Sequence, residues 1–149
     1  MSPLRLFRTT AVAEAVTWAL LLLGMFLKYV TETTDAAVSI FGPIHGVAFI
    51  AYGLTAILVA VDQRWSPART ALALLAAIPP FFTVLFDLLA ERRGAFTAQW
   101  RLMSSEPQRP LDRPVAWLLR NPGRGAVAGV VAVVVLTGLA LAVGPPVGG

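Results

Sequence analysis

Cysteine is absent from this chain of 149 residues, and histidine occurs only once, at His45. The absence of cysteine excludes disulfide bonds, thiolate nucleophiles, iron–sulfur ligation and zinc sites of the CxxC type. A single histidine without cysteine is a poor basis for a metal site. No Ser–His–Asp order with a nucleophile elbow is present either. We therefore expect no metal, no cofactor and no enzymatic activity.

Charge is also scarce, since 13% of the residues are charged and 57% are hydrophobic. Ordinary soluble domains carry about one-quarter charged residues. A membrane-spanning helix needs roughly 20 apolar residues, so this chain has room for about four of them. The composition predicts an all-α membrane protein, organised as a bundle of four transmembrane helices.

Four apolar stretches predict these helices, at residues 10–30, 44–61, 68–89 and 125–143. The first is not expected to be a signal peptide, because it is longer than a signal core and contains Glu14. The second begins beside Gly42 and Pro43, since proline is tolerated in a first helical turn. The predicted organisation is a three-helix membrane core over 1–93, a basic amphipathic loop over 94–124 and a fourth transmembrane helix over 125–143.

The third stretch is interrupted at its centre by Pro79 and Pro80. One interpretation is a proline-kinked spanning helix, which is the commoner use of such a sequence. The other is a re-entrant hairpin of two half-length helices, which needs surrounding protein to satisfy the freed backbone groups. With an inside N-terminus, four spans leave 4 positive residues inside and 8 outside, whereas the hairpin leaves 11 inside and 1 outside. We favour the kinked span and keep the hairpin as the alternative.

The segment 94–124 is basic, and the whole chain has eleven arginines and one lysine. Because the arginines flank apolar stretches, the expected partner is a bilayer with anionic headgroups, and no nucleic acid is expected. Phe96, Trp100 and Met103 are spaced to form one face of a short helix in the headgroup layer. A solvated loop with scattered apolar residues is the alternative.

Six polar residues in or beside the apolar stretches form the candidate functional cluster: Glu14, Lys28, Tyr29, His45, Tyr52 and Asp87. Ionisable groups inside a membrane are costly, so each needs a partner, a hydrated cavity or an interface. Antiparallel packing of the first two helices places His45 at the level of Lys28. A spanning third helix adds Asp87 to this level, whereas a re-entrant hairpin places Asp87 with Glu14.

Structural roles are open for the same residues. Lys28 can extend to the headgroups from a helix end, and Asp87 can pair locally with Arg92. Glu14 can be a structural partner of Arg8 or Arg64, and His45 can bond within a helix interface. Close helix packing is expected at five glycines: Gly42, Gly46, Gly53, Gly125 and Gly129.

Four motifs resemble a family of small bacterial integral membrane proteins known as domain of unknown function 3817. They are "FRTTAVAEAVTW", "FLKY", "GPIHGVAFIAYG" and "PPFFTVLFD", and the resemblance covers roughly residues 5–93. The matching positions are Phe7, Arg8, Glu14, Lys28, Tyr29, Gly42, His45, Gly46, Phe49, Tyr52, Pro80, Phe81, Thr83 and Asp87. Departures occur at Ala15, Thr17, Phe26 and Phe82. The resemblance implies a multi-helix bacterial membrane protein and supplies no activity. The expected location is the bacterial cytoplasmic membrane, which the chain crosses several times.

The favoured function is that of a non-enzymatic accessory or assembly subunit of a larger membrane complex, for instance a respiratory one. It predicts a membrane-protein partner or a homo-oligomer. The alternative is an oligomeric carrier of protons or small solutes that uses Glu14 and the residues around His45. A membrane enzyme acting on lipid or isoprenoid needs a metal or nucleophile that the sequence does not show.

Overall fold

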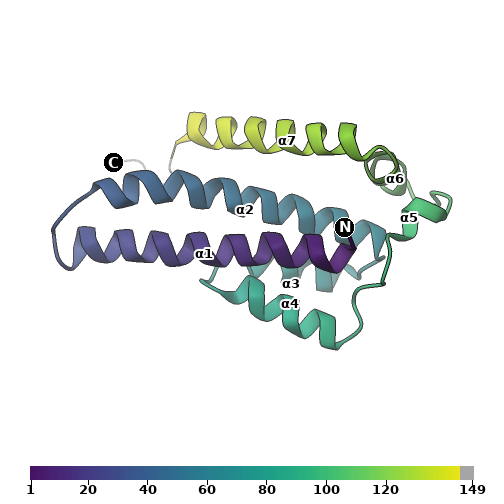
Figure 1. Cartoon of the computed structure of the whole chain (residues 1–149), viewed down its shortest axis with the longest axis horizontal. Helices are drawn as coiled ribbons and strands as arrows, with labels where there is room; N and C mark the ends of the chain where they lie inside the picture. The colour runs from purple at the N-terminus through teal and green to yellow at the C-terminus, as the bar shows by residue number, and fades with distance from the viewer. Residues whose placement is uncertain (145–149) are drawn as a thin grey trace.

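Residues 1–144 are described by a computed structural model, in which they form seven helices and no strand (Figure 1). The helices are α1 (Pro3–Tyr29), α2 (Ala36–Asp62), α3 (Pro67–Leu75), α4 (Phe82–Arg92), α5 (Arg101–Ser104), α6 (Asp112–Arg120) and α7 (Pro122–Val143). Three of the described helices, α1, α2 and α7, are long and apolar enough to cross a membrane. The all-helical fold is thus confirmed, with three candidate membrane spans among the described residues, whereas four transmembrane helices are not confirmed.

Helices α1 and α2 pack side by side in opposite directions and form the body of the fold (Figure 1). The side chain of Ser2 caps α1 by accepting the backbone N–H of Arg5, and Pro3 occupies the first turn. Helix α2 begins at Ala36, eight residues before the predicted start, so Pro43 lies inside it. Membrane helices tolerate internal proline when their surroundings compensate the lost hydrogen bond. His45 therefore lies well inside α2 and not at its beginning.

Helices α3 and α4 form a short hairpin where the sequence predicted one helix over 68–89. Pro79 and Pro80 lie in the turn that joins them, and Phe81 has a positive φ of 67°. The hairpin ends lie together, because Trp65 Nε1 donates to the Ala95 carbonyl across a distance of 2.8 Å. Two successive prolines remove two backbone donors and disfavour helix in the residue before each. The chain reverses there, as the re-entrant alternative predicts, and the kinked continuous helix is not found.

The basic segment folds differently from the predicted short helix through Phe96 and Met103. Residues 95–100 are irregular, and Phe96 and Trp100 pack against the core of the α1, α2 and hairpin unit. Helix α5 is only four residues long. The amphipathic helix of this segment is α6, which buries Asp112, Val115 and Ala116 on one face.

Helix α7 packs against α2 and α6, whereas the hairpin packs against α1 and α2. None of the residues of α7 is buried. Figure 1 shows the N-terminus, α5 and α6 at one end of the molecule and the α1–α2 connection at the other. The arginine-rich segment therefore lies at the same end as the chain's beginning.

Candidate functional site

The fully buried ring of Phe7 lies at the centre of the contact between α1 and the hairpin. Its centroid is 5.4 Å from that of Tyr52 on α2, 5.7 Å from Trp65 and 5.9 Å from Phe86 on α4. The ring of Phe96 is also 5.4 Å away. Tilted and edge-on aromatic pairs at these distances are favourable. Phe7 thus joins α1, α2, both ends of the hairpin and the following loop.

Arg8 bridges two carboxylates of α4. Its Nε lies 2.7 Å from Asp87 Oδ2, and its Nη2 lies 2.6 Å from Glu91 Oε2. The side chain of Asp87 is 2% exposed, whereas those of Arg8 and Glu91 are partly exposed. A buried carboxylate needs a partner of opposite charge, which Arg8 provides. The pair attaches the second half of the hairpin to the beginning of α1.

Glu14 meets the hairpin near its turn. It is fully buried, and its Oε2 lies 2.7 Å from the hydroxyl of Thr83, at the beginning of α4. The same hydroxyl lies 3.1 Å from the carbonyl oxygen of Ala11. Glu14 is the twelfth residue of α1, about 16 Å along a helix of about 40 Å. A carboxyl group and a hydroxyl therefore meet near mid-helix, enclosed by protein.

Backbone carbonyls of the hairpin are satisfied by side chains of the two long helices. The hydroxyl of Tyr52 donates to the carbonyl of Ala73 at 2.8 Å. The indole N–H of Trp18 donates to the carbonyl of Ala77 at 3.3 Å. Both acceptors lie in the last turns of the α3 half, where helical carbonyls lose their intrahelical partners. A turn placed inside a membrane would need such donors from the surrounding protein.

His45 contacts the middle of α1 and not Lys28. Its Nδ1 lies 3.0 Å from Thr17 Oγ1, and its ring lies 4.5 Å from that of Trp18. The hydroxyl of Thr17 uses its single hydrogen in a 2.8 Å bond to the carbonyl of Glu14. The Nδ1 atom must then carry a hydrogen and donate to Thr17. The reason for the shift from the predicted level is that α2 begins nine residues before His45.

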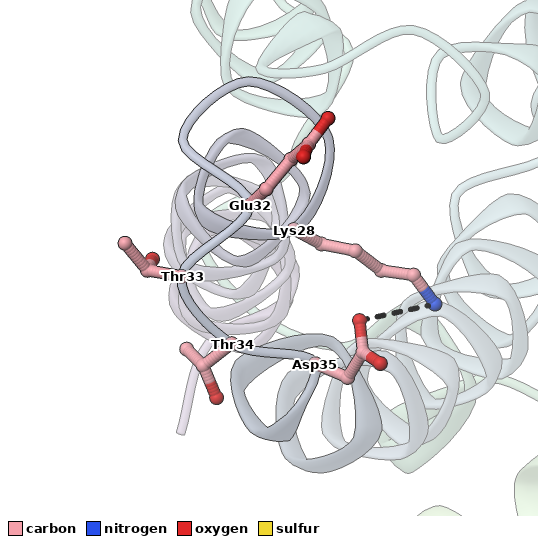
Figure 2. A pocket seen from close by; sticks show the side chains of 5 residues that line it. All are labelled: Lys28, Glu32, Thr33, Thr34 and Asp35. Carbon is pink, nitrogen blue, oxygen red and sulfur yellow. Dashed lines mark ion pairs between the residues drawn. The ribbon is translucent and has the colours of Figure 1, made fainter.

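Lys28 and Tyr29 lie at the far end of α1, beside the connection to α2. Figure 2 shows Lys28 reaching toward Asp35, and the Nζ to Oδ1 distance is 3.6 Å. The ammonium group also lies 5.3 Å from the centroid of the exposed Tyr29 ring. An open polar pocket at this connection is lined by Lys28, Glu32, Thr33, Thr34 and Asp35 (Figure 2). The predicted set of six therefore separates, with Glu14, Tyr52 and Asp87 at the hairpin, His45 beside them, and Lys28 with Tyr29 elsewhere.

The five glycines expected to pack closely have different surroundings. A Cβ added to Gly42, Gly46, Gly53 or Gly129 would meet no atom within 4 Å in residues 1–144. One added to Gly125 would collide with the carbonyl of Leu118 in α6. The close approach of α1 and α2 occurs at Gly24, where a Cβ would lie 3.1 Å from the backbone of Ala37 and Val38.

Asp62, at the end of α2, holds the loop that follows the hairpin. Its carboxylate accepts the backbone N–H groups of Arg101 at 3.1 Å and Leu102 at 2.9 Å. The Nε of Arg101 returns a bond to the Asp62 carbonyl at 2.6 Å. These contacts fix the position of α5 against the end of α2.

Asp112 organises the next turn. Its Oδ2 accepts the backbone N–H groups of Gln108 at 3.1 Å and Arg109 at 3.3 Å. Burial acts to raise the pKa of Asp112, but these two bonds and the charges of Arg101 and Arg64 outweigh it, so the pKa lies below its ordinary value. Asp112 therefore stays ionised and holds the beginning of α6.

Arg8, Thr17, Trp18 and Thr83 contribute to the site although they were not in the predicted set. Their signal was present, because all four lie in the motifs "FRTTAVAEAVTW" and "PPFFTVLFD". Side-chain hydroxyls in apolar segments attract less attention than charges, yet here they complete the bonds of Glu14 and His45. Within residues 1–144, no group of three or more His, Asp or Glu side chains is arranged to hold a metal ion.

Comparison with known families shows where these contacts belong. Residues 4–92 match the family described as "Domain of unknown function (DUF3817)". The chain belongs to the DUF3817 family. The DUF3817 region ends with α4, so it contains α1, α2 and the hairpin, with every contact of Phe7 to Tyr52, Trp65 and Phe86.

A similar protein of Streptomyces coelicolor carries the name "Putative membrane protein SCO5905". It is 52% identical over 92 residues, which make up 61% of this chain and 11% of that protein. The matched segment therefore spans about a ninth of the relative's length. No solved structure matches the chain. The chain is thus a bacterial-type membrane protein of the DUF3817 family.

Proposed function

We propose that the chain is a non-enzymatic, multi-pass protein of the bacterial cytoplasmic membrane that serves as an accessory or assembly subunit of a larger membrane complex. The observation that carries this proposal is the Streptomyces relative, in which the similar segment occupies only 11% of the protein. A segment similar to this chain is there part of a much longer polypeptide. Covalent linkage keeps two modules at a high effective concentration. We propose that the DUF3817 region of this chain reaches a similar association through contacts of its exposed surface.

Helix α7 offers a surface for such contacts. It has no buried residue, and a Cβ added at Gly129 would meet no atom within 4 Å among the described residues. Small residues on a membrane helix let a second helix approach closely. The basic loop adds exposed arginines at one end of the molecule, where anionic headgroups or an acidic partner can bind: Arg92, Arg93, Arg109, Arg113 and Arg124.

The orientation that fits this assignment has the N-terminus inside and the hairpin as a re-entrant element entering from the inside. Helices α1, α2 and α7 cross, and the 11 positive residues of the N-terminal part, the second connection and the basic loop lie inside. Lys28 is then the one positively charged residue on the outer side. The carbonyl bonds from Tyr52 and Trp18 support a hairpin within the membrane.

Purification from native membranes in mild detergent tests the accessory role. We expect the tagged protein to migrate with a partner, in a complex well above its own mass of 15.9 kDa. The substitution Gly129→Leu should reduce recovery of the partner if α7 is the contact, whereas Gly53→Leu on α2 serves as a matched glycine control. Migration alone at its own mass, after crosslinking in the intact membrane, would contradict the proposal.

An oligomeric carrier of protons or small solutes is the second candidate. It is favoured by the carboxyl of Glu14, which is fully buried near the middle of α1, and by His45 of α2, which contacts Thr17 three residues further along α1. Flux into proteoliposomes tests it. Equal flux through the wild-type protein and a His45→Ala, Glu14→Gln double variant would exclude the carrier.

A further inference from the structure

The hydroxyl of Thr83 faces two acceptors but has one hydrogen. Glu14 Oε2 lies 2.7 Å from it, and the carbonyl oxygen of Ala11 lies 3.1 Å from it. A threonine hydroxyl donates one hydrogen bond and accepts others. If Glu14 is an ionised carboxylate, both neighbours are acceptors only, and one of the two close contacts lacks a hydrogen.

A proton on Glu14 resolves this conflict. The acid group then donates from Oε2 to Thr83 Oγ1, and Thr83 donates to the carbonyl of Ala11. Each of the two close contacts then has one hydrogen, and both hydrogen bonds point from Glu14 toward the carbonyl of Ala11. The other carboxyl oxygen, Oε1, is buried and has no partner among the described residues. An unpaired carbonyl oxygen of a neutral acid costs less to bury than an unpaired oxygen of a carboxylate.

The charges around Glu14 agree with a neutral acid. On α1, the nearest cation is Arg8, which is already shared between Asp87 and Glu91 of α4. From α2, Tyr52 donates to Ala73, and His45 is bonded to Thr17. A fully buried, ionised Glu14 would therefore lack a cation to pair with, because the contacts of the Arg8 guanidinium are made with Asp87 and Glu91. Such uncompensated charge is strongly disfavoured.

We propose that Glu14 is a proton-binding site, occupied at neutral pH, whose proton lies in a hydrogen-bonded chain from Glu14 through Thr83 to Ala11. The site joins the middle of α1 to the beginning of α4, so the bound proton links the re-entrant hairpin to the spanning helix. If Glu14 were ionised, Thr83 could donate to only one of its two acceptors, and the attachment of α4 to α1 would be weaker. This inference stands whether the chain is an accessory subunit or a carrier.

Infrared difference spectroscopy of the protein in liposomes at pH 7 tests the site. A protonated carboxylic acid has a C=O stretching band separate from those of carboxylates and amides. We expect this band in the wild-type protein and its loss in Glu14→Gln. The variant should still fold, because the glutamine amide can donate to Thr83 as the acid does. The matched control Glu91→Gln changes a partly exposed carboxylate and should keep the band.

Substitutions at Thr83 test the chain itself. Thr83→Val removes the acceptor of the acid proton, so the band should shift to higher frequency, whereas Thr83→Ser should leave it in place. The absence of the band in the folded wild-type protein, or its persistence in Glu14→Gln, would overturn the proposal. An unshifted band in folded Thr83→Val would equally overturn the hydrogen-bonded chain. If Thr83→Val does not fold, the comparison of Glu14→Gln with Glu91→Gln decides the question.

Discussion

Arg8 and Asp87 are 79 positions apart in the sequence, yet Arg8 Nε donates to Asp87 Oδ2 at 2.7 Å. Arg8 lies in the second turn of α1, and Asp87 lies in the second turn of α4. Their contact requires α4 to run back toward the beginning of α1. The hairpin therefore has both ends near the N-terminal end of α1, and its turn near Trp18 at mid-helix.

Arg8 and Asp87 should be energetically coupled. Arg8→Gln leaves the carboxylate of Asp87 buried without its partner, whereas Arg8→Gln with Asp87→Asn removes both charges. We expect a coupling free energy of about 1 kcal/mol, since Arg8 keeps some contact with solvent. Reversible unfolding in detergent micelles measures this coupling from four proteins: the wild type, Arg8→Gln, Asp87→Asn and the double variant. Strictly additive effects of the two substitutions would contradict the pairing.

Tyr52→Phe should lower the free energy of unfolding by about 1 kcal/mol, because the carbonyl of Ala73 loses its donor in a buried position. Tyr29→Phe is the matched control, since the side chain of Tyr29 is exposed at the other end of α1 and gives up no such bond. Thermal unfolding in one detergent compares them. Equal midpoints for the two variants would show that the Tyr52 hydroxyl does not support the hairpin.

Phe7→Ala should destabilise the protein by about 3–5 kcal/mol, because it leaves a cavity among four aromatic rings. The same substitution at Phe26, which is half exposed on α1, removes a similar volume from the outer surface. It should cost much less. Denaturant midpoints in micelles provide the measurement, and similar losses for both variants would be inconsistent with a Phe7-centred core.

Low pH should release the turn that Asp112 holds. In the folded protein the pKa of Asp112 lies below its ordinary value. Burial raises this pKa, but the N–H groups of Gln108 and Arg109 and the nearby arginines lower it by more. The stabilisation is therefore present above the ordinary aspartate pKa of about 3.9 and is lost as pH falls through the lower folded value. Amide chemical shifts of Gln108 and Arg109 should follow one titration below that value. Asp112→Asn should abolish it, and a midpoint above the ordinary value would contradict the assignment.

Much of the fold could be predicted because long apolar stretches define spanning helices. Residues 10–30, 44–61 and 125–143 correspond to α1, α2 and α7, although all three helices begin earlier than predicted. The early starts of α1 and α2 depend on local features, a serine cap at Ser2 and a proline accommodated inside α2 at Pro43. The prediction placed His45 beside Lys28 because it assumed that α2 begins at residue 44. Since α2 begins at Ala36, His45 lies further along the helix and contacts Thr17 instead.

The third stretch could not be assigned from hydropathy alone, because a kinked helix and a hairpin have the same composition. The deciding contacts are long-range, between Arg8 and Asp87 and between Trp65 and Ala95. The charge distribution did favour the hairpin, with 11 positive residues on one side. The sequence also predicted that a re-entrant turn needs donors from surrounding protein, which the structure identifies as Tyr52 and Trp18.

The membrane orientation of the hairpin is the central claim, and single-cysteine labelling tests it most directly. No native thiol competes, so cysteines at Ser2, Thr33, Ser66 and Ser104 can each be probed with a membrane-impermeant reagent in intact cells. The account predicts that Ser66→Cys and Ser104→Cys share the protected inner side with Ser2→Cys, and that only Thr33→Cys reacts from outside. Opposite sides for Ser66→Cys and Ser104→Cys would mean that residues 67–92 cross the membrane, and would contradict the re-entrant hairpin.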